Sequence, residues 1–101
     1  MKGGNNMIKV VVKNFIKKEN VQDVLNLAKE LVEKTVKETG CISYEIYQDE
    51  KDNNILTMIE TWENKEALTI HSKSEHFQRI VPAMSVFMEK AGEMNLYNKV
   101  L

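Results

Sequence analysis

Two histidines, His71 and His76, are the only imidazoles in this chain of 101 residues. An imidazole has a reference pKa near about 6.5, so it can act as a general base at neutral pH. His71 follows an apolar stripe of Ala67, Leu68 and Ile70. That position suggests a place in the wall of a pocket. The alternative is a half-buried histidine whose hydrogen bond is only structural.

Three polar or aromatic residues on expected strands could line the same pocket. Asn14 lies on the more apolar face of its strand, where it could bind a ligand oxygen or be satisfied by solvent. Glu60 alternates with Met58 and Trp62, so it is either a buried carboxylate that needs a partner or a sign of a wet surface. Trp62 could form one wall of a cleft or belong to the ordinary core.

His76 and Arg79 stand further along the chain. His76 could line the pocket entrance or face water, and Arg79 could hold an anionic substrate or be solvated. Five residues on a helix turn by about 500°, so we expect the rings of His71 and His76 to lie far apart and share no metal ion. Cys41 is most simply a small buried residue, with a reactive thiol as the alternative.

Alternating apolar residues predict strands, and i, i+3, i+4 spacing predicts helices. A helix from Val21 to about Val36 should be capped by Asn20 and end at Gly40. A second helical region should be broken, with Asn64 and Ser74 capping its two parts and Gly92 ending it. The expected strands are Met7 to Ile16, Cys41 to Gln48, Ile55 to Trp62 and Met94 to Leu101.

The order βαββαβ predicts an α+β, ferredoxin-like fold, with both helical regions on one face of a four-stranded antiparallel sheet. The helix-covered face is expected to carry Val10, Val12, Ile42, Tyr44, Leu56 and Met58. The opposite face is also apolar, because it carries Val11, Phe15, Tyr47, Ile55 and Ile59. One helical layer covers one face only, so we expect two copies to pack sheet to sheet as a homodimer.

Two stretches resemble the antibiotic biosynthesis monooxygenase (ABM) family. The segment from Glu38 to Glu45 is similar to the family's passage from first helix to second strand. The segment from Ile59 to Phe77 resembles its signature of Glu-x-Trp, a short helix and two histidines five residues apart. The similarity extends from Met7 to Leu101 and implies a dimeric α+β barrel.

The family includes cofactor-independent monooxygenases of quinols and polyketide phenols, haem-degrading enzymes and an isomerase-like processor of a phosphorylated sugar. The resemblance is nearest to the quinol type, which implies O2 as co-substrate and no cofactor, with His71 as base, Asn14 orienting oxygen and Trp62 shaping the pocket. Substrate contacts are then expected from His76, Glu60, Met58 and Arg79. The isomerase alternative would use the same two histidines and could recruit Arg79 for a phosphate group, and a further alternative is a non-catalytic binding or stress-response module.

Haem degradation fits the residues poorly, although Asn14 matches the family's strand asparagine. The tryptophan position of the haem degraders is occupied by His71, and their ligating histidine by about Val81. An aliphatic side chain in that place removes the axial ligand on which haem chemistry depends.

Composition excludes other classes of function. Fourteen Lys and Arg against fifteen Asp and Glu give a formal charge of −1 with the signs interspersed, which disfavours nucleic-acid binding. No apolar run approaches the roughly 20 residues of a membrane span, so no membrane partner is expected. A lone cysteine favours a reducing cytoplasm. We expect residues 1–6 to form a flexible arm and residues 7–101 to form one ABM-like domain.

Overall fold

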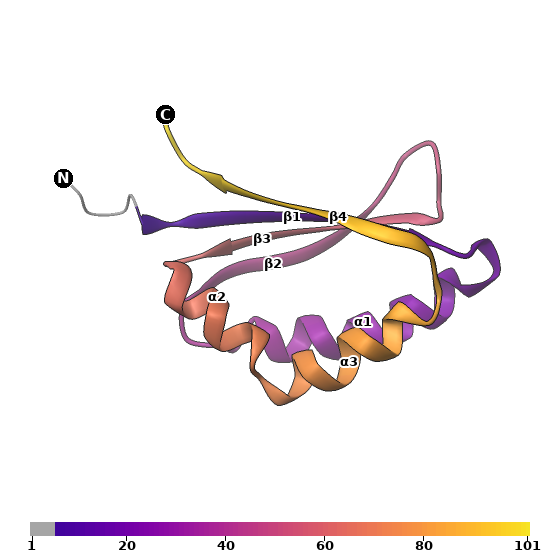
Figure 1. The fold of residues 1–101 in the computed structure, drawn as a ribbon, viewed down its shortest axis with the longest axis horizontal. Coiled ribbons are helices and arrows are strands. Elements are labelled where there is room, and N and C mark those ends of the chain that lie inside the picture. Colours follow the sequence, from indigo (N-terminus) through magenta and orange to yellow (C-terminus); the bar gives the residue numbers. More distant parts are fainter. Residues whose placement is uncertain (1–5) are drawn as a thin grey trace.

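The computed structural model describes residues 6–101, so the expected arm lies outside the described residues except for Asn6. Four strands form one antiparallel sheet, and the helices cover one of its faces, as expected for the ferredoxin-like α+β fold (Figure 1). The strands are β1 (Ile8–Ile16), β2 (Cys41–Gln48), β3 (Ile55–Trp62) and β4 (Met88–Asn98). The helices are α1 (Val21–Thr35), α2 (Lys65–Ser72) and α3 (Glu75–Ser85), and a 3-10 turn at Lys18–Asn20 precedes α1.

The strand order is β2-β3-β1-β4, so the valine-rich β1 lies inside the sheet. Cross-strand pairing sets rows of side chains on the face toward the helices. Tyr44 pairs with Glu60, and Glu60 pairs with Val10. In the next row, Met58 pairs with both Ile46 and Val12. Because alternate residues share a face, these rows bring the candidate residues of β1 and β3 to the inner side.

Helices α1 and α3 pack on each other and bury apolar side chains against the sheet. The buried residues of these two helices are Val24, Ala28, Leu31, Thr35, Ile80 and Met84. The break between α2 and α3 lies where the caps predicted it. The Asn64 side chain accepts from the Ala67 N–H, and that of Ser74 accepts from the Phe77 N–H. The side chain of Asn20 instead donates to Asp23 and does not cap α1.

Two details of the predicted sheet were wrong. Strand β4 begins at Met88, six residues before the predicted start, and Gly92 lies within it where the pairing with β1 shifts register. This half of the strand contains helix-favouring residues such as Glu89 and Ala91, so its sequence does not indicate a strand. Pairing with β1 overrides their helix propensity. Ile42 is the extra residue of a bulge in β2 and is half exposed. It therefore does not share the covered face with Tyr44.

None of the helices in the described range 6–101 combines the length and apolarity needed to span a bilayer.

Candidate functional site

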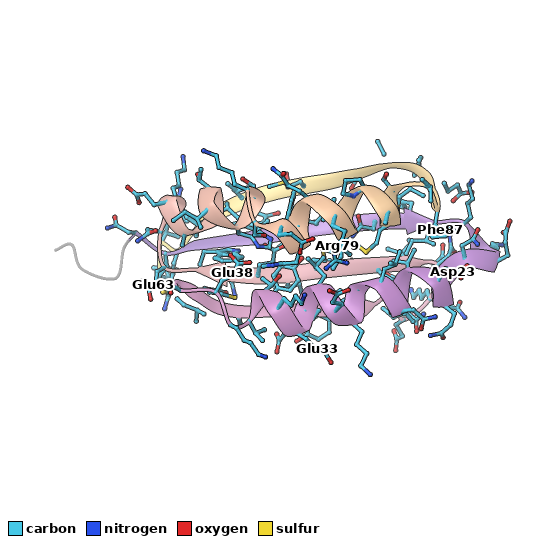
Figure 2. All side chains as sticks on the ribbon, turned by 90° about the horizontal axis from the view of Figure 1, so that it is seen from below. Asp23, Glu33, Glu38, Glu63, Arg79 and Phe87 are labelled. Carbon is cyan, nitrogen blue, oxygen red and sulfur yellow. The ribbon has the colours of Figure 1, made fainter. Side chains whose placement is uncertain are left out.

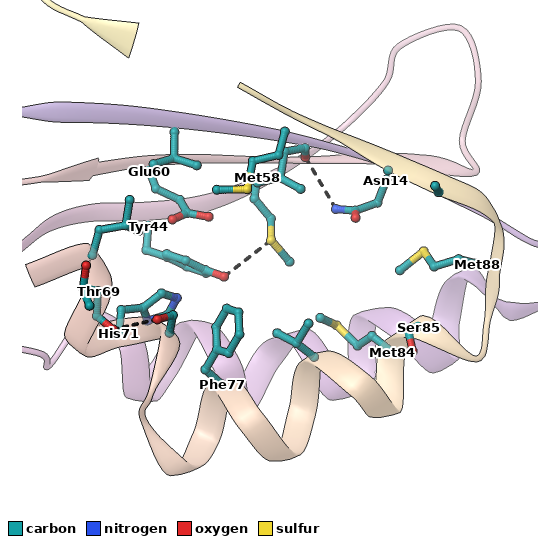
Figure 3. Close-up of a pocket in the computed structure, with 18 of the residues that line it drawn as sticks. Asn14, Tyr44, Met58, Glu60, Thr69, His71, Phe77, Met84, Ser85 and Met88 are labelled. Atoms are coloured by element: carbon teal, nitrogen blue, oxygen red, sulfur yellow. Dashed lines mark hydrogen bonds between the residues drawn. The ribbon is translucent and has the colours of Figure 1, made fainter. Parts of the chain in front are cut away.

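A cavity of about 670 Å³ lies between the inner face of the sheet and helices α2 and α3, with β4 along its edge (Figure 3). Its lining is mostly apolar and rich in methionine. The polar side chains that reach it include those of Asn14, Tyr44, Glu60 and His71. A largely apolar cavity with a few convergent polar groups is the usual form of a small-molecule site.

His71 comes from the last turn of α2 and is 2% exposed. Its Nδ1 atom lies 2.7 Å from Oε2 of Glu38. Because a carboxylate only accepts, this bond places a proton on Nδ1 and leaves Nε2 with its lone pair. The ring packs 4.7 Å from the Trp62 ring and edge-on to Phe77 at 5.0 Å. His71 lines the cavity and Glu38 does not, and Nε2 is the ring nitrogen whose lone pair is not engaged by Glu38.

Burial lowers the pKa of His71, and the bond to Glu38 opposes this shift. A ring with a lowered pKa is neutral at physiological pH, which is the form that accepts a proton. The arrangement can therefore act as an oriented general base.

His76 lies just outside this wall, in the first turn of α3. Its Nε2 atom is 2.6 Å from the same Oε2 of Glu38, and the two histidine rings are 6.1 Å apart. The expectation that these rings lie far apart was wrong. A rotation of about 500° applies within one continuous helix, whereas the expected break, which lies at Lys73 and Ser74, redirects the chain and brings both rings to one carboxylate. His76 does not line the cavity, so it has no place among direct substrate contacts.

Glu38 was missed as a site residue by the sequence analysis. It follows the end of α1 and stands in the segment that carries the family resemblance, but nothing in its spacing indicates two histidine partners. Glu38, His71 and His76 form the group in the described part of the chain whose donor atoms could surround a metal ion, with all three atoms within 4.8 Å of one another.

Glu60 points into the cavity from β3 and is 4% exposed. The Trp62 indole Nε1–H donates to its Oε1 atom at 2.9 Å. Burial raises the pKa of Glu60 to about 7, while the bond from Trp62 acts in the opposite direction. Glu60 is therefore a buried carboxyl group with a hydrogen-bond partner, which is the first of the two alternatives, and not a residue on a wet surface.

Trp62 is fully buried and does not line the cavity, which places it in the core. It therefore forms no wall of the cavity itself. Its contacts are with two residues that do line it, since its indole N–H holds Glu60 and its ring packs on His71.

Asn14 lines the cavity at the β1–β4 side, and its only side-chain bond among the described residues is a long one of 3.5 Å to the Val12 carbonyl. Its amide is thus available to a ligand. Met58 also lines the cavity, where its sulfur accepts from the Tyr44 hydroxyl at 3.4 Å. Tyr44 lies on the face that its alternation in β2 predicts, although it was not among the predicted site residues. Burial strongly raises the pKa of Tyr44, so it remains a neutral donor.

Arg79 lies on the outer helical surface between α1 and α3, away from the cavity (Figure 2). Its guanidinium donates to Glu75 at 2.7 Å and also pairs with Glu30. Arg79 is therefore in no position to contact a substrate in this cavity.

Cys41 is half-buried, and burial raises the pKa of its thiol to about 11. A protonated thiol is a poor nucleophile, which leaves the reactive-thiol alternative without support.

Comparison with known proteins agrees with this architecture. A conserved protein from Methanosarcina mazei Go1 has a TM-score of 0.93 and 43% identity, over 96% of both chains. A structure described as an antibiotic biosynthesis monooxygenase has a TM-score of 0.90 and 39% identity, over 93% of this chain and 99% of the other.

Among curated relatives, the uncharacterised protein sll1783 of Synechocystis is 29% identical over 96% of this chain. The chain spans 66% of that relative's length. The family model for antibiotic biosynthesis monooxygenase matches residues 7–83. The chain therefore belongs to the antibiotic biosynthesis monooxygenase family.

Proposed function

We propose that this protein is a cofactor-independent monooxygenase of an electron-rich aromatic molecule such as a quinol. The observation that carries the proposal is His71, whose Nδ1 is held by Glu38 while the ring lines an apolar cavity. A group fixed in this way can take a proton from a phenolic hydroxyl through Nε2. Glu38 is then a positioning residue that fixes the tautomer of the base.

The chemistry requires no external reductant. A quinol that reacts with O2 gives a hydroxyquinone and water, so the substrate itself supplies the electrons and one oxygen atom leaves as water. Deprotonation by His71 makes the ring electron-rich enough to react with oxygen. The apolar lining, which includes Phe77, Met84 and Met88, excludes water from the anion that forms.

The remaining polar groups have separate roles in this proposal. Asn14 orients the oxygen or an oxygen-derived group through its amide. Glu60 is about half protonated near pH 7 and largely protonated below it, so it can supply the proton that the departing oxygen atom needs. Trp62 acts indirectly, since it holds Glu60 in place. Met58 and the other methionines provide an adaptable apolar surface for a flat ring.

The isomerase alternative has less support, because it assigned a substrate phosphate to Arg79, which is paired with Glu30 and Glu75 outside the cavity. Product mass separates the two reactions, since isomerisation adds no oxygen. A non-catalytic binding module would retain a ligand without consuming O2.

The test is oxygen uptake by the purified, chelator-treated protein with a panel of quinols and polyphenols. We expect protein-dependent uptake that falls by about a hundredfold or more in His71→Ala, as is typical for loss of a general base. Arg79→Ala is the control and should retain uptake, because its side chain lies outside the cavity. Unchanged uptake in His71→Ala would refute the assignment of the base.

A further inference from the structure

A second site lies on the outer side of the cavity wall, where Glu38 meets both histidines of the chain. The His71 Nδ1, His76 Nε2 and Glu38 Oε2 atoms all lie within 4.8 Å of one another. All three side chains are largely shielded from solvent, with exposures of 3%, 14% and 13%. They come from three separate segments of the chain, namely α2, α3 and the turn after α1.

We propose that Glu38, His71 and His76 form a three-ligand binding site for a divalent transition-metal ion of the Zn²⁺ type. Two imidazoles and one carboxylate are a donor set that suits such an ion, and three protein ligands leave a fourth position open. The set carries one negative charge when both rings are neutral, which favours a cation at its centre.

The geometry requires side-chain movements of about 1.5 Å or less. Zinc bonds of about 2.0–2.1 Å in a tetrahedron separate neighbouring ligand atoms by about 3.3 Å. The carboxylate oxygen now lies 2.7 Å and 2.6 Å from the two ring nitrogens. An ion would replace the two N–H protons and widen each contact by less than about 1 Å. Rotation of the largely buried Glu38 side chain can supply that change, and the two ring nitrogens, which lie within 4.8 Å of each other, would also approach by up to about 1.5 Å through rotation of the imidazoles.

The surroundings give an ion access from solvent. Glu38 lines a surface hollow that is separate from the main cavity, together with Glu63, Glu66 and Lys73. Three carboxylates, that of Glu38 included, against one ammonium group make the hollow acidic, which attracts a cation. The open coordination position would face this hollow, whereas His71 also lines the main cavity.

Metal binding would change what His71 presents to the cavity. Coordination through Nδ1 moves the ring proton to Nε2, so the ring donates to a ligand and no longer accepts a proton. A bound ion would therefore inhibit the oxygenase reaction. This consequence rests on the proposed function, but metal binding itself does not.

The test is calorimetric titration of the chelator-treated 101-residue chain with Zn²⁺, in two buffers that differ in ionisation enthalpy. We expect one ion per chain and a binding enthalpy that does not depend on the buffer, because each neutral ring moves its N–H proton to its other nitrogen and releases none. Glu38→Gln and His76→Gln should each weaken binding by tenfold or more. Glu66→Gln, in the rim of the same hollow, should change it by less than about threefold.

Two outcomes would overturn the proposal. Binding that is equally strong in wild type, Glu38→Gln and His76→Gln would indicate a surface site elsewhere. Absence of saturable binding in the wild type would mean that the cluster is only hydrogen-bonded. Circular dichroism of each variant checks that the fold is retained. If Zn²⁺ binds as expected but leaves oxygen uptake unaffected, the site stands and the assignment of His71 as the base fails.

Discussion

At the scale of single residues, two of the titratable groups that line the cavity, His71 and Glu60, lie in unlike settings. His71 is anchored by a carboxylate, so one of its nitrogens has a defined proton. Glu60 has one indole N–H as its partner and is otherwise desolvated. Groups whose surroundings shift their pKa values in this manner are the ones that exchange protons with a ligand near neutral pH.

Glu60 should make the stability of the protein depend on pH. Its pKa is about 7 in the folded chain, against an ordinary value of 4.5 for a solvated glutamate, so the folded chain binds more protons between these values. The free energy of unfolding should therefore fall as pH rises from about 4.5 to 7, by on the order of 2–3 kcal/mol. Urea unfolding at pH 5 and pH 8 measures the change.

Glu60→Gln is the matched variant for this prediction, because it keeps the shape and an oxygen for the Trp62 N–H. In this variant, the free energy of unfolding should differ much less between pH 5 and pH 8. The difference that remains comes from other titratable groups. If wild type and Glu60→Gln respond to pH equally, the carboxyl group is not buried as described.

At the scale of elements, the turn between α1 and β2 fixes Glu38 beneath α2. Gly40 in this turn has φ of +89°, a conformation that favours glycine. A Cβ atom there would lie 2.5 Å from the Ala67 Cβ of α2. Gly40→Ala should therefore destabilise the fold by on the order of 1–3 kcal/mol, from backbone strain and the clash. Thermal unfolding of the variant gives the value.

The control is Thr39→Ala at the neighbouring, exposed position. It should change the free energy of unfolding by less than about 0.5 kcal/mol. An equal loss of stability in both variants would show that any substitution in this turn is destabilising, and that the close contact between residue 40 and Ala67 is not the cause.

The same elements show what the sequence could predict. Strong periodicity gave β1, β2, β3 and α1, and the caps at Asn64 and Ser74 gave the break between α2 and α3. The start of β4 was missed because its first residues favour helix and only pairing with β1 determines their state.

Only part of the site could be predicted, because some of its contacts join segments that lie far apart in the sequence. Alternation along β1 and β3 placed Asn14, Met58 and Glu60 on the face that lines the cavity. The contact of Glu38 with both histidines depends on the angle between two short helices, which local patterns do not encode. The ion pairs that hold Arg79 on the surface are likewise contacts between distant segments.

At the scale of the whole molecule, the helices cover one face of the sheet and leave the other open (Figure 1). The open face carries Val11, Phe15, Tyr47, Ile55 and Ile59, with Val11 and Ile59 paired at its centre. We propose that two copies pack through this face, since a monomer would leave an extended apolar patch in water. Light scattering after gel filtration should give the mass of a dimer.

A charge at the centre of the open face should break this association. Ile59→Lys places an ammonium group opposite its own copy near the symmetry axis, where burial without a partner costs several kcal/mol. The variant should elute as a folded monomer. Ile70→Lys is the matched control, because Ile70 is 65% exposed on the helical side and its replacement should leave the dimer intact. A wild-type monomer, or a dimer that survives Ile59→Lys and not Ile70→Lys, would place the interface elsewhere.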